Sequence, residues 1–145
     1  MTTIEASGNV SSLSKLRLWT ARIMGGLVVA FMLVDSVPKI FPNEATIAGM
    51  AGLGYQAHHI PIFGTLAFIS TLLFAIPRTQ ILGAILLTGY FGGAIATHVR
   101  LGHPLFSLIF FPGYLAILAW LSVWLRNERL RNLILNNRSS GARQA

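Results

Sequence analysis

The chain has 145 residues, of which 54% are hydrophobic and only 10% charged, and its mean hydropathy is +0.65. A composition this apolar argues against an ordinary soluble domain and favours an all-α integral membrane protein. Cysteine is absent, which excludes disulfides, thiolate-held metals, Cys-ligated iron–sulfur clusters and thiol nucleophiles.

The first residues, 1–14, mix Thr, Ser, Gly and Asn without an apolar period, which predicts a disordered cytoplasmic lead. The first membrane span is expected at about 18–41, within a membrane domain that covers 15–135. Arg17 and Arg22 precede its apolar core as in a signal peptide, but no small-x-small cleavage site follows. The span is therefore expected to stay attached.

One seam of this span carries residues at alternating steps of four and three: Ala21, Gly25, Val28, Met32, Asp35 and Lys39. Such spacing packs one helix face against its neighbours at a shallow angle. Asp35 precedes Lys39 by four residues, which is the better order for a helical ion pair. The pair either faces the bundle interior or only caps the bundle at the outer surface, and the spacing leaves both interpretations open.

The segment 43–55 keeps a short helical period that is interrupted by Gly52 and Gly54. It is too short to cross a membrane, and we predict an amphipathic half-helix at the outer leaflet. His58 and His59 follow it, just before a second span at about 60–76. The PRTQ turn at 77–80 then returns the chain, so the second and third spans should form an antiparallel hairpin.

The third span, at about 80–98, is unusually rich in small residues. Gly89, Gly92 and Gly93 lie in rows of small residues spaced four apart, which favours close helix–helix contact in lipid. Together with Gly25 of the first span, they are our candidate packing residues. The alternative is that membrane helices are simply richer in glycine than soluble ones.

The fourth span is expected at about 105–125, with a kink at Pro112 and Gly113. The chain therefore reads as a four-transmembrane-helix bundle with a half-helix between its first two spans. Residues 136–145 are predicted to be a disordered basic tail.

The basic residues are distributed unevenly: nine of the 11 Lys and Arg fall at one end of this bundle, and only Lys39 and Arg100 at the other. Because short cytoplasmic loops retain Lys and Arg, both termini are predicted to be cytoplasmic. The three tryptophans fall at the same end, at the headgroup boundary. The net charge of +7 is thus a topology signal, and no nucleic-acid partner is expected.

The ionisable side chains near the outer end are Asp35, Lys39, Glu44, His58, His59, His98, Arg100 and His103. An apolar slot that ends in hydrogen-bonding groups suits a quinone or another amphipathic lipid. We therefore take Asp35, Lys39, His98 and Arg100 as candidate ligand-binding residues, roofed by 43–55. Haem is disfavoured because no two histidines face each other across the bundle interior, and no short motif places a metal site.

The run IPRTQILGAILLTGYFGGAIATHVRLGHPLF at 76–106, together with VDSVPK at 34–39 and GLGY at 52–55, resembles the DoxX-like family. This family comprises small four-span bacterial membrane proteins, so the resemblance implies a place in the bacterial cytoplasmic (inner) membrane. The family pattern highlights Asp35, Lys39, Thr97, His98 and Arg100. At Ser36 and His103 the chain departs from that pattern, where glycine and an acidic residue are common, and no acid–base role is assigned to His103.

Two classes of function follow from the resemblance. Some relatives are associated with thiosulfate:quinone oxidoreductase and membrane redox complexes, which implies a redox-associated membrane subunit with a quinone- or lipid-headgroup site. The other class is a non-catalytic structural or assembly subunit of a larger membrane complex, or of a homo-oligomer. The sequence does not assign a catalytic residue in either case.

Overall fold

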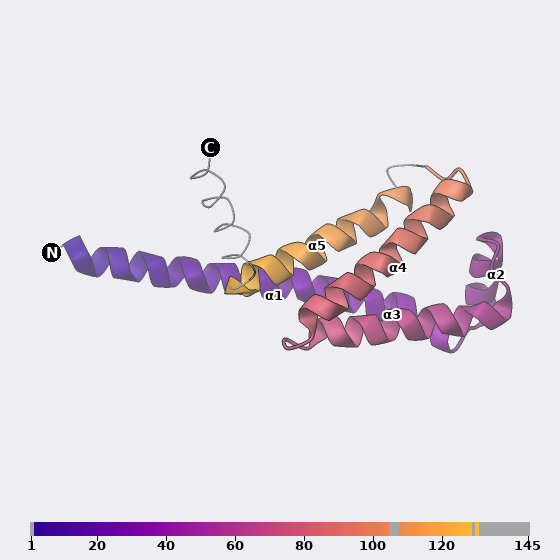
Figure 1. Ribbon diagram of the computed structural model, residues 1–145, viewed down its shortest axis with the longest axis horizontal. Helices are drawn as coiled ribbons and strands as arrows, with labels where there is room; N and C mark the ends of the chain where they lie inside the picture. Colours follow the sequence, from indigo (N-terminus) through magenta and orange to yellow (C-terminus); the bar gives the residue numbers. More distant parts are fainter. Residues whose placement is uncertain (1, 105–107, 129, 131–145) are drawn as a thin grey trace, which may run out of the picture.

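The computed structural model, shown in Figure 1, describes residues 2–104, 108–128 and 130, and its side chains from residue 14 onward. Within this part of the chain every regular element is a helix. The elements are α1 (Thr2–Ile40), α2 (Glu44–Gly52), the short 3-10 helix η1 (Ala57–His59), α3 (Ile60–Ala75), α4 (Gln80–Arg100) and α5 (Phe111–Arg126). The predicted disordered tail at 136–145 lies outside the described residues.

The first helix is longer than the sequence predicts. It begins at Thr2 and runs for 39 residues, so the segment 2–14 is helical where a disordered lead is expected. Adding a turn to an existing helix avoids the cost of nucleation, because each further residue adds one hydrogen bond for one fixed residue. The apolar part of α1 can therefore extend its helix through a polar segment that would not form a helix alone.

The four long helices form a ring in which each contacts two neighbours. α1 packs between α3 and α5, and α4 packs between the same two helices from the other side. Consequently α1 and α4 face each other across the diagonal, and α3 and α4 form the predicted hairpin (Figure 1). The core runs along the inner faces of all four, with Val28, Met32, Ala67, Phe74, Ala84, Leu87, Phe91, Leu115, Ala119 and Val123.

Three helical stretches are long and apolar enough to cross a membrane: Ser14–Ile40, Ala57–Ala75 and Gln80–Arg100. The fourth, α5, is shorter and begins at Phe111 instead of residue 105. Pro112 lies in its first turn, where the missing N–H has no helical partner to lose. Pro112 therefore lies at the start of α5 and does not form the predicted kink inside a helix. Residues 105–107 of the expected span lie outside the described residues.

Helix backbones come close together at glycines, but most of these glycines are not the ones that the sequence predicts. A Cβ built on Gly83 would collide with the backbone of Phe74, and one on Gly64 would lie 2.6 Å from the backbone nitrogen of Ile40. Gly25 packs against Ser122, whose Oγ lies 2.7 Å from the corresponding Cβ position.

The glycines of the middle of α4 behave differently. Nothing lies within 4 Å of the Cβ positions of Gly89, Gly92 and Gly93. The expected packing role of these three glycines inside the bundle is thus wrong, because the faces of α4 that carry them do not meet another helix of the chain. Small residues favour close approach only where a neighbouring backbone actually lies opposite.

Candidate functional site

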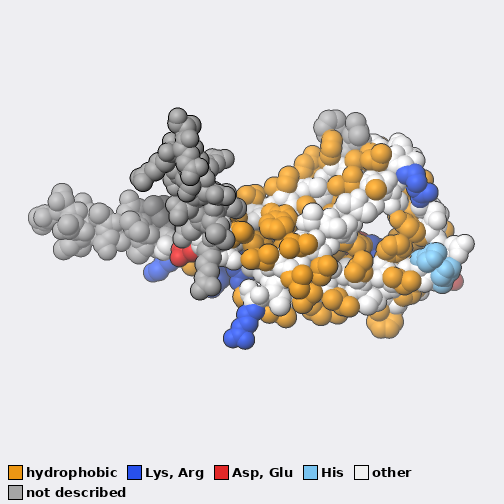
Figure 2. Space-filling view, in the orientation of Figure 1, with side chains coloured by type: hydrophobic (Ala, Val, Ile, Leu, Met, Phe, Trp, Pro, Cys, Tyr) orange, Lys and Arg blue, Asp and Glu red, His pale blue; other side chains and the backbone are white. Residues whose placement is uncertain are grey.

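A cavity of about 700 Å³ lies between the diagonal helices α1 and α4, at the end of the bundle that α2 covers. Its walls are mainly apolar and include Phe31, Phe63 and Leu115. Figure 2 shows the hollow opening between hydrophobic side chains near this end. Gly89 and Gly93 line the cavity, and their missing side chains provide part of its room.

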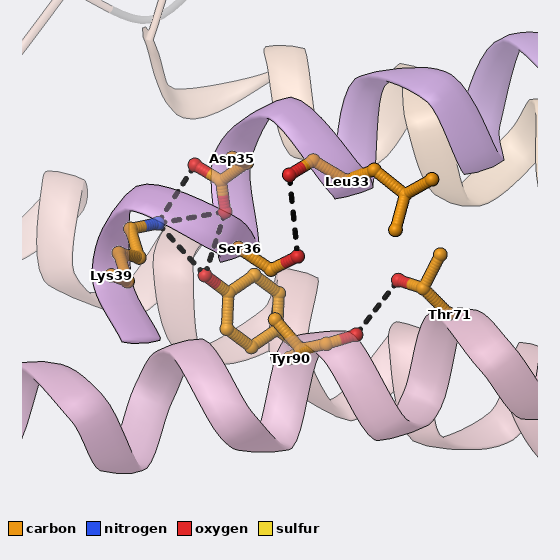
Figure 3. Close-up of polar contacts among 7 residues, drawn as sticks. Leu33, Asp35, Ser36, Lys39, Thr71 and Tyr90 are labelled. Carbon is orange, nitrogen blue, oxygen red and sulfur yellow. Dashed lines mark hydrogen bonds and ion pairs between the residues drawn. The ribbon is translucent and has the colours of Figure 1, made fainter. Parts of the chain in front are cut away.

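The polar centre of the cavity consists of Asp35 and Lys39 from α1 and Tyr90 from α4. Lys39 Nζ donates to both carboxylate oxygens of Asp35 at 2.7 Å and to the Tyr90 hydroxyl at 3.0 Å. Tyr90 in turn donates to Asp35 Oδ2 at 3.0 Å, as Figure 3 shows. The three side chains therefore link the diagonal helices through a closed set of hydrogen bonds, and we call them the ion-pair cluster.

The position of the ion-pair cluster follows from the seam of α1. Val28, Met32 and Ser36 of this helix are fully or almost fully buried, so the neighbouring face turns toward the cavity. At the end of α1, Gly64 of α3 lies directly against the backbone of Lys39. This contact fixes where the lysine side chain starts, and Lys39 and Asp35 remain only 17% and 29% exposed.

A second polar contact joins the segment after α2 to α4. The hydroxyls of Tyr55 and Thr97 lie 2.7 Å apart, and Thr97 also donates to the backbone oxygen of Gly93 at 3.0 Å. The ring of Tyr55 packs edge-on against Phe63, with centroids 4.7 Å apart. Tyr55 thus ties the cover of the cavity to both α3 and α4.

The end of α4 brings two histidines together. Gly102 has a φ of +66°, and the backbone N–H of His103 bonds to the carbonyl of His98 at 3.1 Å. This hydrogen bond is the one that closes a Schellman-type helix C-terminus, for which glycine is the favoured residue. It places the Nδ1 atoms of His98 and His103 2.7 Å apart at the edge of the cavity.

Arg100, one of the candidate ligand-binding residues, forms a hydrogen bond within the chain. Its guanidinium donates to the backbone oxygen of Leu53 at 2.9 Å, next to Gly54, which has a φ of +84°. The side chain therefore holds the chain that leaves α2. At its other end α2 is capped by Asn43, whose Oδ1 accepts from the Thr46 N–H at 2.9 Å. Thr46, Met50 and Leu53 line the cavity, so the segment 43–55 roofs it as the sequence predicts.

The four candidate ligand-binding residues do not form one hydrogen-bonded cluster. Asp35 and Lys39 lie together, and His98 lines the same cavity but bonds to His103. Arg100 is absent from the described cavity lining. The partner that α4 supplies to Asp35 is Tyr90, which sequence reasoning missed, although a tyrosine inside an apolar span is itself a signal for a buried polar tip.

No group of three or more His, Asp or Glu that could hold a metal ion occurs among the described residues. His58 and His59, with ring centroids 3.9 Å apart, lie in η1 outside the cavity lining. The described cavity combines apolar walls with eight polar side chains, an arrangement that suits an amphipathic molecule.

The model of a family described as the DoxX-like family matches residues 23–122, which is more than half of the chain. No curated protein and no solved structure matches the sequence.

Proposed function

The chain belongs to the DoxX-like family, and we propose that it is a four-span membrane protein that binds the head group of a quinone-like or other lipid ligand in the cavity. The observation that carries this proposal is the cavity itself. Its volume of about 700 Å³ falls within the range of small-molecule sites, roughly 300 to 1,000 Å³. An apolar wall suits a lipid tail, and the polar groups suit its head.

The bilayer is supported by the surface of the bundle. Large apolar side chains such as Val34 and Phe41 are 75% and 80% exposed, which is costly in water and favourable in lipid. Figure 2 shows hydrophobic side chains over much of this face, with Lys and Arg near both ends and His at one of them. The distribution of Lys and Arg along the sequence, read with the positive-inside rule, supports the proposal that both termini are cytoplasmic. The cavity then opens near the outer face of the cytoplasmic membrane.

Family membership adds the redox association to this proposal. Some relatives are associated with quinone-dependent membrane redox complexes, and a cavity for a lipid-like ligand is compatible with such a role. We therefore propose a redox-associated membrane subunit. The chain's own residues bind and orient the ligand in this role, and no catalytic residue is assigned.

A second candidate is a structural or assembly subunit of a membrane complex or homo-oligomer. It is favoured by Gly92, which lies exposed on α4 with nothing within 4 Å of its Cβ position. In a complex, such a face can receive a neighbouring helix closely. The two candidates differ in what the purified protein retains: a stoichiometric lipid in the first, and companion proteins without a bound lipid in the second.

The test is native mass spectrometry of the protein released from gentle detergent. We expect a stoichiometric lipid-like molecule on the parent protein and its loss in Gly93→Leu, because the leucine side chain extends into the cavity. Gly92→Leu is the matched control, since its Cβ position is equally open but lies outside the cavity lining. Retention of the ligand by Gly93→Leu, or its absence from the parent, would contradict the proposal.

A further inference from the structure

The hydrogen-bond donors of the described cavity lining are almost all in use, and this restricts which ligands the lining can bind. Eight of the described lining residues carry polar side chains: Asp35, Lys39, Thr46, Tyr55, Tyr90, Thr97, His98 and His103. Each donor has a fixed number of protons, so the protons left for a ligand can be counted.

The ion-pair cluster has no proton to offer. An ammonium group has three protons, and those of Lys39 go to the two oxygens of Asp35 and to the Tyr90 hydroxyl. The hydroxyl proton of Tyr90 goes to Asp35. What remains is acceptor capacity, because an ionised carboxylate offers about four lone-pair positions and Asp35 uses three of them.

The hydroxyls near the roof are also committed. Thr97 donates to the carbonyl of Gly93, so in its contact with Tyr55 the tyrosine must be the donor. Thr46 donates to Asn43 Oδ1. These three hydroxyls therefore present only oxygen lone pairs to a ligand.

The histidine pair is the exception. With both rings neutral, a single proton lies between the two Nδ1 atoms of His98 and His103. One ring is then an acceptor at Nε2 and the other a donor. The described lining thus offers a ligand one N–H donor at its edge and several acceptors.

The charges of the cavity lining also restrict which ligand can bind. Asp35 and Lys39 neutralise each other within hydrogen-bond distance, and Arg100, which bonds to the backbone oxygen of Leu53, is not itself among the described lining residues. An anionic head group would find no free cation there, and a cationic one would meet the ammonium group of Lys39. Transfer of an unpaired charge into such a site is unfavourable.

We propose that the cavity selects an uncharged amphiphile whose head group carries hydroxyl donors, such as a quinol or another lipid alcohol, over anionic lipids and over head groups that only accept. This inference rests on the proposed function, because it names the ligand class of the same site. A hydroxyl of the head group donates its one proton to a free lone pair of Asp35 or of Tyr90, and the tail lies along the apolar walls.

The test compares three amphiphiles with one tail on the protein in nanodiscs of neutral lipid: a decyl-substituted hydroquinone, its dimethyl ether and decyl phosphate. We expect the hydroquinone to bind roughly tenfold or more tightly than the ether, because hydrogen bonds to charged groups have about this effect. Decyl phosphate should bind most weakly. Equal affinity for hydroquinone and ether, or tightest binding of the phosphate, would overturn the inference.

A variant sharpens the result. Tyr90→Phe frees one proton of Lys39, so the cavity gains a donor and its preference for hydroquinone over ether should fall severalfold. Tyr114→Phe is the matched control, since Tyr114 is half exposed on α5 and outside the cavity lining. If Tyr90→Phe fails to fold, the three probes on the parent protein still decide.

The outcomes also separate this inference from the proposed function. Binding of hydroquinone and ether with equal affinity, abolished by Gly93→Leu, would leave the lipid site intact and refute only the donor preference. Failure of all three probes to bind would refute both.

Discussion

The two halves of helix α4 use glycine in opposite ways. Around Gly25, Gly83 and Ser122, the helices touch and their polar groups are satisfied by one another; we call this region the closed half. There Ser122 donates to the carbonyl of Ala21 at 3.0 Å and lies 3.5 Å from Gln80 Nε2. Around the cavity, the open half, Gly89 and Gly93 of the same helix α4 have empty space beside them. A small residue permits close approach in the first case and leaves a cavity in the second.

This difference suggests how a small bundle can be both stable and able to bind. The closed half joins α1 to α5 and α3 to α4 by direct contact, while at the other end the ion-pair cluster links the diagonal helices α1 and α4. A binding site needs such space, and rigid contact elsewhere keeps its walls in place. The same type of substitution should therefore change the stability of the protein differently in the closed half and in the open half.

The largest effect is expected for Gly83→Ala in the closed half. Its new Cβ would collide with the backbone of Phe74, and a backbone cannot rotate away as a side chain can. Overpacking costs typically about 1 to 3 kcal/mol, and we expect at least the upper end here, seen as a lower melting temperature in detergent. Gly92→Ala is the control without a contact. A Gly83→Ala protein that melts like Gly92→Ala would show that α3 and α4 do not meet as described.

A smaller loss of stability is expected for Asp35→Ala in the open half. Breaking a fully buried ion pair costs about 3 to 5 kcal/mol, and because Lys39 and Asp35 are 17% and 29% exposed, we expect about 2 kcal/mol. Removing both charges should cost less than removing Asp35 alone, since no unpaired charge is left. A thermal-melting double-mutant cycle measures this.

The control for this cycle is Arg17→Ala, which breaks the 3.2 Å contact with Glu128, whose side chain is 68% exposed. Exposed pairs contribute about 0 to 1 kcal/mol. If Asp35→Ala lowers the stability no more than Arg17→Ala does, the ion-pair cluster is fully exposed to solvent. It would then not be part of the interior of the cavity.

The sequence predicts the helices better than their contacts. The starts of α3 at residue 60 and of α4 at residue 80 could be predicted because Pro61 and the PRTQ turn mark them locally. The ion pair of Asp35 and Lys39 was also predictable, because both partners lie on one helix at a spacing of four.

What the sequence could not supply is which face of α4 meets which neighbour. The rows of small residues at Gly89, Gly92 and Gly93 look the same whether a helix or a cavity lies opposite. The partners Tyr90 and His103 are likewise set by the ring order of the helices and by the backbone turn at Gly102. These are properties of the assembled bundle and do not appear in local spacing.

The smallest effect, and the sharpest test of the contrast, is Gly89→Ala. Gly89 and Gly83 both lie inside α4, and replacing a helix-interior glycine by alanine favours the helix by up to about 1 kcal/mol. At Gly89 nothing lies within 4 Å of the new Cβ, so we expect a gain of about 0.5 kcal/mol, after allowing for the weaker propensity differences expected in a packed helix. The same substitution thus stabilises the open half and destabilises the closed half, and thermal melting of the two variants side by side shows both signs. A loss in Gly89→Ala comparable to that in Gly83→Ala would mean that a backbone lies against α4 along its whole length, and the cavity between α1 and α4 could not then exist.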